Sequence, residues 1–135
     1  NETYVKKLQI EARIIGDMCL NHVIPAAVRY QNILIENVKG MKDIFGDDYL
    51  NYCASEIETL KKISTYINNV SADVEGLVEA RKKANRIEAI AERAKVYSYE
   101  VKDMMEKVRV SADNLEMLID DEVWPLPKYR ELLFF

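Results

Sequence analysis

The sequence predicts an all-α fold, an elongated up-down-up bundle of three helices followed by an extended, proline-rich C-terminal tail. Apolar residues recur three and four positions apart along almost the whole chain, and the alternation typical of strands is absent. The 135 residues include only four glycines and three prolines, so few turns separate the helices. Short links make neighbouring long helices antiparallel. A helix of about 38 residues is ~57 Å long, so a rod is expected.

The first helix is expected over residues 2–40, and its apolar stripe starts at Val5 and Leu8. Gly40 and the IFGDD segment that follows are predicted to end it. Helical pattern begins within two residues of the first position, as it would in a piece taken from a longer chain. We therefore expect a single helical domain, residues 1–135, belonging to a larger protein.

Pro25 lies inside this first helix and predicts a kink. Its ring nitrogen carries no hydrogen for the carbonyl of Asn21, which leaves backbone groups exposed near the proline. The side chains of Asn21 and His22 stand where they can satisfy those groups, and this structural role is the favoured interpretation. The alternative is that His22 contacts a ligand or an interface, since histidine is the side chain that titrates most readily near neutral pH.

Two further helices are predicted, over residues 48–84 and 86–119. Asp47 or Asp48 is a suitable N-cap for the second helix, and the break after it, within the basic run RKKANR, is weak. The third helix is predicted to stop at the segment DDEVWPLP, because proline does not continue a helix. The remaining residues, 122–135, form the predicted tail.

Composition and charge exclude several classes of function. The 19 basic and 23 acidic residues give a net charge of −4, which argues against nucleic acid or an anionic membrane as the main partner. No apolar run approaches the ~20 residues that cross a bilayer, and no signal peptide opens the sequence. Cys19 and Cys53 both fall on apolar helical faces, so we interpret them as buried thiols in a reducing cytoplasm.

The sequence predicts no catalytic, cofactor-binding or metal-binding residue. A single histidine cannot assemble the two-histidine sites of bundle metalloenzymes, which argues against a metal or cofactor enzyme. No glycine-rich loop is present to hold a phosphate, and neither cysteine has a histidine partner in a spaced motif. The paired carboxylates at 47–48 and 120–121 lie at expected helix ends, without a cleft in which to work as acid and base.

The tail sequence WPLPKYRELLFF is too apolar for a solvated terminus. Two prolines give it an extended path, and burying one large apolar side chain is worth about 1.5–3 kcal/mol. We therefore expect the tail to dock, either on its own bundle or on another domain, and patch size does not separate these alternatives. The candidate interaction residues are Trp124, Leu126, Tyr129, Arg130, Leu132, Leu133 and Phe134.

The two ends of the chain resemble one known family. The segment SADNLEMLIDDEVWPLPKYRELLFF (111–135) is similar to the C-terminal end of type III glutamine synthetases, and IEARIIGDMCLNHVIPAAVRYQN (10–32) resembles their segment just after the catalytic body. The resemblance covers the whole chain and is loosest from about 45 to 90. The motif residues that recur in order are Trp124, Pro125, Pro127, Tyr129, Glu131 and Phe134.

This resemblance implies that the parent is a cytoplasmic bacterial ligase, which joins ammonia to glutamate with ATP and magnesium. The catalytic and cofactor residues of the family lie upstream, so none is carried over to this chain. The implied partners are the catalytic domains and neighbouring subunits of a homo-oligomer of stacked rings, and the implied role is assembly or regulation. The alternative from the residues alone is a free-standing helical-bundle adaptor that binds a partner helix in a groove.

Overall fold

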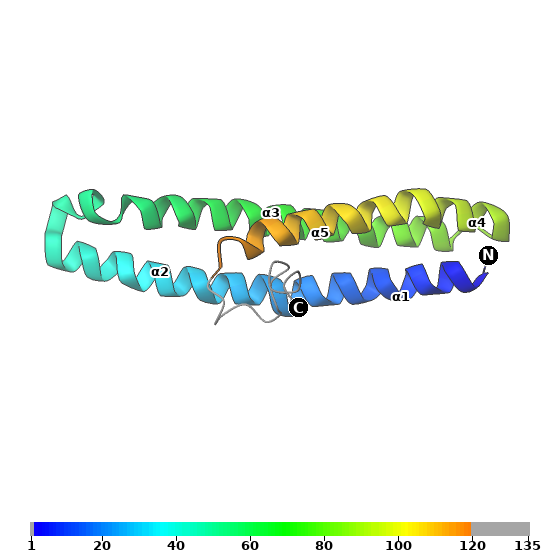
Figure 1. Cartoon of the computed structure of the whole chain (residues 1–135), viewed down its shortest axis with the longest axis horizontal. Helices are drawn as coiled ribbons and strands as arrows, with labels where there is room; N and C mark the ends of the chain where they lie inside the picture. Colours follow the sequence, from blue (N-terminus) through cyan, green and yellow to red (C-terminus); the bar gives the residue numbers. More distant parts are fainter. Residues whose placement is uncertain (1, 120–135) are drawn as a thin grey trace, which may run out of the picture.

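The structure, a computed structural model, describes residues 2–119 and is a long rod of antiparallel helices (Figure 1). Its elements are, in chain order, α1 (Glu2–Met18), the π-helical turn η1 (Cys19–Val23), α2 (Ile24–Phe45), the 3-10 turn η2 (Gly46–Asp48), α3 (Leu50–Asn85), α4 (Ile90–Val96), the π-helical turn η3 (Tyr97–Val101) and α5 (Lys102–Glu116).

These elements form three helical rods. The segments α1, η1 and α2 make one continuous helix, α3 returns alongside it, and α4, η3 and α5 make the third rod, which packs on α3 and α1 (Figure 1). The predicted all-α, three-helix fold is therefore confirmed for the described residues. The predicted tail, residues 122–135, lies outside them.

The first turn of the bundle comes five residues later than predicted. Helix α2 runs through Gly40 to Phe45, and the chain turns only at Gly46, whose φ of 60° and ψ of −136° suit glycine. Asp47 and Asp48 lie in the turn η2 and make no capping bond to α3, so the predicted N-cap is wrong. The carboxylate of Asp48 instead accepts a hydrogen bond from the side chain of Asn51.

The third rod is shorter than predicted. Helix α3 ends at Asn85, four linking residues follow, and α4 begins at Ile90 rather than near residue 86. Ala89 has extended backbone, with ψ of 118°, so the helical pattern in the sequence starts before the helix does. At its other end α5 stops at Glu116, and the described chain finishes in turns.

Pro25 is accommodated by a π-helical turn, and the helix continues through it. The amide of Ile24 donates to the carbonyl of Cys19, five residues back, which shifts the hydrogen-bond register just before the proline. Pro25 then occupies the first turn of α2, where a missing N–H costs little. The predicted kink at Pro25 stays a prediction, and what the structure shows there is a widened, π-helical turn.

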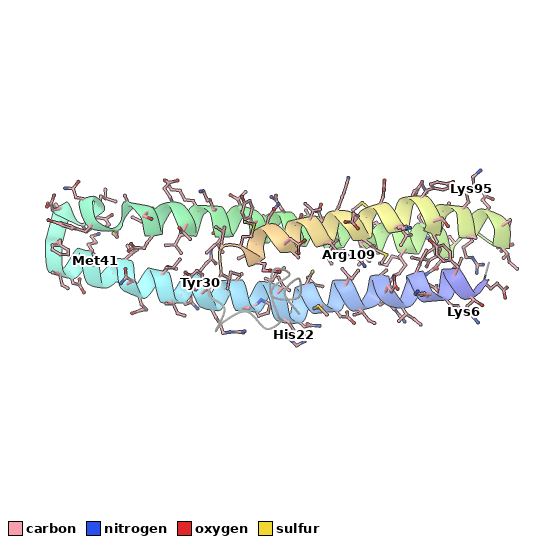
Figure 2. All side chains as sticks on the ribbon, in the orientation of Figure 1. Lys6, His22, Tyr30, Met41, Lys95 and Arg109 are labelled. Carbon is pink, nitrogen blue, oxygen red and sulfur yellow. The ribbon has the colours of Figure 1, made fainter. Side chains whose placement is uncertain are left out.

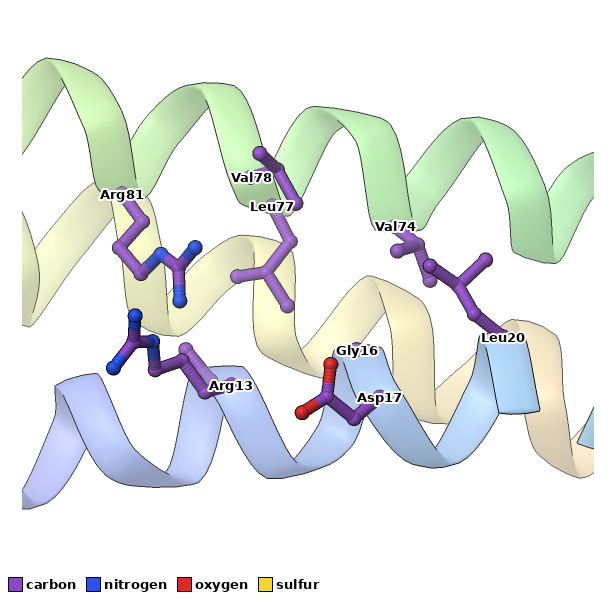
Figure 3. Close-up of a pocket in the computed structure, with 9 residues that line it drawn as sticks. Arg13, Gly16, Asp17, Leu20, Val74, Leu77, Val78 and Arg81 are labelled. Carbon is purple, nitrogen blue, oxygen red and sulfur yellow. The ribbon is translucent and has the colours of Figure 1, made fainter. Parts of the chain in front are cut away.

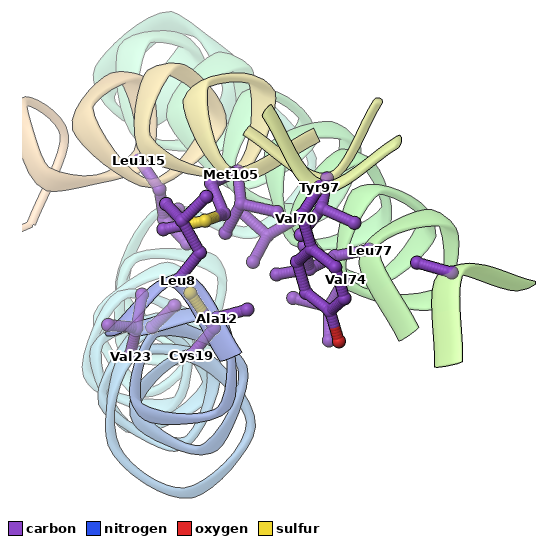
Figure 4. Packing of buried hydrophobic residues seen from close by; sticks show 14 of the residues in the cluster. Leu8, Ala12, Cys19, Val23, Val70, Val74, Leu77, Tyr97, Met105 and Leu115 are labelled. Carbon is purple, nitrogen blue, oxygen red and sulfur yellow. The ribbon is translucent and has the colours of Figure 1, made fainter. Parts of the chain in front are cut away.

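The core lies where all three rods overlap (Figure 4). Tyr97 is fully buried, and its hydroxyl donates to Oδ1 of Asn85 over 2.5 Å. The side chain of Gln9 donates to the same oxygen over 3.0 Å, so α1, α3 and η3 meet at Asn85. The apolar part of the cluster includes Val5, Leu8, Ala12, Cys19, Val23, Ile63, Val70, Val74, Leu77, Val101, Met105, Val108, Leu115 and Ile119.

Gly40, inside α2, and Gly46, at the first turn, should respond oppositely to alanine. Gly40 lies inside α2 with open space around its Cβ position, so Gly40→Ala should raise the free energy of unfolding by about 0.5–1 kcal/mol through helix propensity. Gly46 has positive φ, so Gly46→Ala should lower it by about 1–3 kcal/mol. Urea denaturation followed by circular dichroism measures both. Equal effects would contradict the assigned turn position.

Candidate interaction surface

No metal centre or membrane span occurs within the described part of the chain. Residues 2–119 contain no group of three His, Cys, Asp or Glu side chains arranged to hold a metal ion. None of the helices there is both long and apolar enough to cross a bilayer.

Both cysteines are buried thiols, as the sequence predicted. Burial raises the pKa of the Cys19 thiol to about 11. Burial also raises the pKa of the Cys53 thiol, and the nearby carboxylate of Glu56 raises it further. A thiol with a raised pKa carries little reactive thiolate at neutral pH, which argues against a nucleophilic role for either residue.

The predicted kink residues lie on the outer side of the first rod. His22 points away from the bundle in Figure 2, and both Asn21 and His22 are exposed. Pro25 is half-buried beside them. Neither polar side chain makes a hydrogen bond to another described residue, so their support of the backbone stays a prediction. The other predicted site, from Trp124 to Phe134, lies outside the described residues.

The end of the molecule that carries the Gly46 turn is a hairpin of α2 and α3. Among the described residues, the third helical rod, α4 to α5, does not extend to this end (Figure 1). Ser111 of α5 donates to Asp73 of α3 over 2.5 Å, which sets the register between them, and α5 ends only five residues later. Gln31 of α2 donates to Ser64 of α3 over 2.8 Å near that level. We call the part beyond this bond, residues 31–64, the distal hairpin.

Large apolar side chains gather at the tip of the distal hairpin. Ile44 is 75% exposed and Leu50 is 52% exposed, on either side of the Gly46 turn. Phe45 stacks on Tyr52 with ring centroids 4.1 Å apart, yet both rings are also exposed. We call Ile44, Phe45, Leu50 and Tyr52 the tip patch. Such a patch is typical of a protein–protein contact.

One polar atom of the distal hairpin is buried without a hydrogen-bond partner. Oxygen Oε2 of Glu56 is buried and has no hydrogen-bond partner among the described residues. An unsatisfied buried acceptor costs about 1–3 kcal/mol, so native proteins usually provide a donor. The sequence pattern predicts a third helix nearly as long as the other two, and such a helix would cover the distal hairpin. The exposed surface there was therefore not predicted. The crowding of four large apolar residues around one glycine was the available signal.

A groove between α1 and α3 forms a separate surface feature, near the other end of the rod (Figure 3). Its volume is about 350 Å³, and Arg13 from α1 and Arg81 from α3 point their guanidinium groups toward one another across it. Neither arginine is in a salt bridge with a described residue. The other lining residues are Ala12, Gly16, Asp17, Leu20, Val74, Leu77 and Val78.

Comparison with known proteins connects the chain to one enzyme family. The family model described as the glutamine synthetase C-terminal domain matches residues 1–42. A glutamine synthetase from Bacteroides fragilis (strain YCH46) is 47% identical over 134 residues. A type-3 glutamine synthetase from Dictyostelium discoideum is 28% identical over 149 residues, and a glutamine synthetase from Butyrivibrio fibrisolvens is 28% identical over 133 residues.

The alignments cover nearly all of this chain and a small part of each relative. Each spans 98% of the chain, but only 18% of the Bacteroides and Dictyostelium proteins and 19% of the Butyrivibrio protein. The chain thus spans under one fifth of the length of these relatives. The matched family model describes a C-terminal domain, in agreement with the resemblance seen at both ends of the sequence. Over almost its whole length the chain is therefore similar to a part of glutamine synthetases, one of them a type-3 enzyme, and its first 42 residues match the model of their C-terminal domain.

Proposed function

We propose that this chain is a non-catalytic helical domain of a cytoplasmic type III glutamine synthetase and acts in its assembly. The complete enzyme would join ammonia to glutamate with ATP and magnesium, and the residues for that chemistry would belong to other domains. Support for a non-catalytic role comes from the two thiols, because burial raises the pKa of both and leaves little reactive thiolate at neutral pH. The partners would be the catalytic domains and neighbouring subunits of a ring-stacked homo-oligomer.

The tip patch is the observation that carries the assembly role. Ile44 and Leu50 are more than half exposed, and covering the exposed part of each contributes a share of the ~1.5–3 kcal/mol that full burial of such a side chain is worth. A second copy of the distal hairpin is the partner that fits best. Two antiparallel hairpins packed face to face would form a four-helix bundle. Across the two-fold axis of such a dimer, the tip patch of one copy would contact the tip patch of the other.

Sedimentation equilibrium of the 135-residue chain over a range of concentrations tests this role. We expect reversible dimers in the wild type, and a double substitution, Ile44→Ser with Leu50→Ser, should weaken dimerisation at least about tenfold, the equivalent of 1.4 kcal/mol. The matched control replaces Ile14 and Val110 by serine, since these are 52% and 53% exposed but lie outside the distal hairpin. It should leave dimerisation unchanged.

Two results would contradict the proposal. A wild-type chain that is monomeric at every concentration, or control and tip-patch variants that weaken association equally, would remove the tip patch as an assembly surface. Formation of glutamine by the 135-residue chain supplied with glutamate, ammonia, ATP and magnesium would contradict the non-catalytic part.

A further inference from the structure

Two cations face each other in the groove between α1 and α3. The guanidinium groups of Arg13 and Arg81 point toward one another, and both arginines also line an adjoining hollow of about 260 Å³ together with Lys82 (Figure 3). Asp17 lines the groove as well, but it makes no salt bridge with either arginine. Three cations and one carboxylate leave these two hollows with a net formal charge of +2. Facing like charges repel one another unless an anion lies between them.

The floor of the groove is closed by the packing of α1 on α3. Leu77 is 2% exposed, and a Cβ atom at Gly16 would lie 3.9 Å from Cγ1 of Val74. This apolar floor is already covered by the chain itself, whereas Arg13 and Lys82 are exposed. The contacts that the groove offers to a ligand are therefore mainly those of its charged rim, which favours a small polar ligand over an apolar segment.

A neutral donor lies beside the three cations. Asn85 lines the adjoining hollow, and its Oδ1 accepts hydrogen bonds from the hydroxyl of Tyr97 over 2.5 Å and from Nε2 of Gln9 over 3.0 Å. Its Nδ2 group donates to no described residue. The two bonds hold the side chain from η3 and α1, so this donor is in position before a ligand binds.

The arrangement of the donors favours a phosphate group over a carboxylate. A carboxylate presents its two oxygens in one plane and is matched by the fork of a single guanidinium. A phosphate group presents oxygens in several directions and carries a charge of about −1.5 to −2 at pH 7. It therefore suits two guanidiniums on opposite sides and a net local charge of +2. An extended polyanion fits less well, because the chain as a whole carries −4.

We propose that the groove between α1 and α3 binds a phosphate group, either free phosphate or the end group of a phosphomonoester, between Arg13 and Arg81. Lys82 and Nδ2 of Asn85 supply further donors from the adjoining hollow. One anion then bridges α1 and α3 and removes the repulsion between the two guanidiniums. The site is separate from the assembly surface, because the groove and the distal hairpin do not share a residue.

Titration of the ¹⁵N-labelled 135-residue chain with inorganic phosphate tests the contact directly. At pH 7 and constant ionic strength, the Nε–Hε signals of Arg13 and Arg81 should shift together and saturate with one dissociation constant. Arg29 is the internal control, since it is exposed and outside any salt bridge among the described residues. Acetate should bind at least about tenfold more weakly than phosphate. Equal shifts at all three arginines, or equal affinity for acetate, would overturn the proposal.

Substitutions separate a site built from two guanidiniums from diffuse positive charge. Arg13→Gln and Arg81→Gln should each weaken phosphate binding at least about tenfold through loss of charged hydrogen-bond partners. Arg81→Lys keeps the charge but loses the planar fork, so it should also weaken binding, whereas Arg29→Gln should not. If Arg81→Lys binds phosphate as tightly as the wild type, charge alone accounts for binding and the proposal fails.

Thermal unfolding shows that such losses do not come from a damaged fold. Without phosphate, Arg13→Gln and Arg81→Gln relieve like-charge repulsion and should unfold at no lower temperature than the wild type. Phosphate at ten times its dissociation constant should raise the Tm of the wild type by roughly 3–6 °C more than that of either variant. The comparison cancels the general stabilisation that phosphate gives by exclusion from protein surfaces. An equal rise in all three proteins would contradict a specific site.

Glycerol 3-phosphate distinguishes the two sources of the phosphate group. Tighter binding than inorganic phosphate assigns the site to a phosphomonoester, and weaker binding assigns it to free phosphate; both results support the site. The assembly role can fail without affecting this outcome, since the Ile44→Ser, Leu50→Ser variant should bind phosphate as the wild type does. Loss of binding in that variant would show that the site forms only within an oligomer, which would overturn binding by a single chain.

Discussion

Replacing Leu115 by alanine is expected to lower the free energy of unfolding by about 2–5 kcal/mol. Leu115 is fully buried and lies in the last two turns of α5, where the third rod ends against the core (Figure 4). The loss has two parts, the transfer free energy of the missing carbons and the cavity that they leave. The cost of the cavity depends on how far the neighbouring side chains relax into it.

Urea denaturation of Leu115→Ala, followed by circular dichroism, measures this effect. The matched control is Met117→Ala, two residues further along, because Met117 is 83% exposed and should change the free energy of unfolding by less than about 0.5 kcal/mol. If both substitutions cost the same, α5 does not pack on the core in the described register.

The second large effect is expected at Asn85. Asn85→Ala leaves the hydroxyl of Tyr97 buried without an acceptor and removes the bond from Gln9, so a loss of about 1–3 kcal/mol is expected. Tyr97→Phe removes the hydroxyl and keeps the ring. In a chain that carries Tyr97→Phe, Asn85→Ala should therefore lower the free energy of unfolding by less than it does in the wild type. The position matters because Asn85 joins α1, α3 and η3 at one atom.

A double-mutant cycle on Asn85→Ala and Tyr97→Phe gives the coupling between them. We expect a coupling free energy of about 0.5–3 kcal/mol, the range found for residues in contact. Strict additivity would mean that the tyrosine hydroxyl finds another partner, and the shared hydrogen bond would then not hold η3 to α3.

Local patterns in the sequence were enough to predict the fold class. The spacing of residues such as Val5, Leu8, Val74 and Val108 marks the faces that become the core, because side chains three and four apart share one side of a helix. Pro25 likewise marked a departure from regular helix, since its missing N–H is a local property. The identity of the family was also readable at both ends of the chain, before the comparisons bore it out.

Helix ends were less predictable. Gly40 resembles a helix terminator in the sequence, but packing of α2 against α3 carries the helix on to Phe45, and the positive φ falls on Gly46 instead. In the third helical rod, the apolar pattern predicts a helix over residues 86–119, but α4 begins at Ile90 and α5 ends at Glu116. Propensity is a weak signal that tertiary packing often overrides.

The sequence by itself determined a helical rod and its similarity to the C-terminal domain of glutamine synthetases, because periodicity and motif order are properties of the chain alone. Only the tertiary structure decided which surfaces are left for partners. Within residues 2–119, the register between α3 and α5 leaves the distal hairpin without a third helix, and the pairing of α1 with α3 brings Arg13 to Arg81. Both depend on contacts between residues far apart in sequence, which local spacing does not encode.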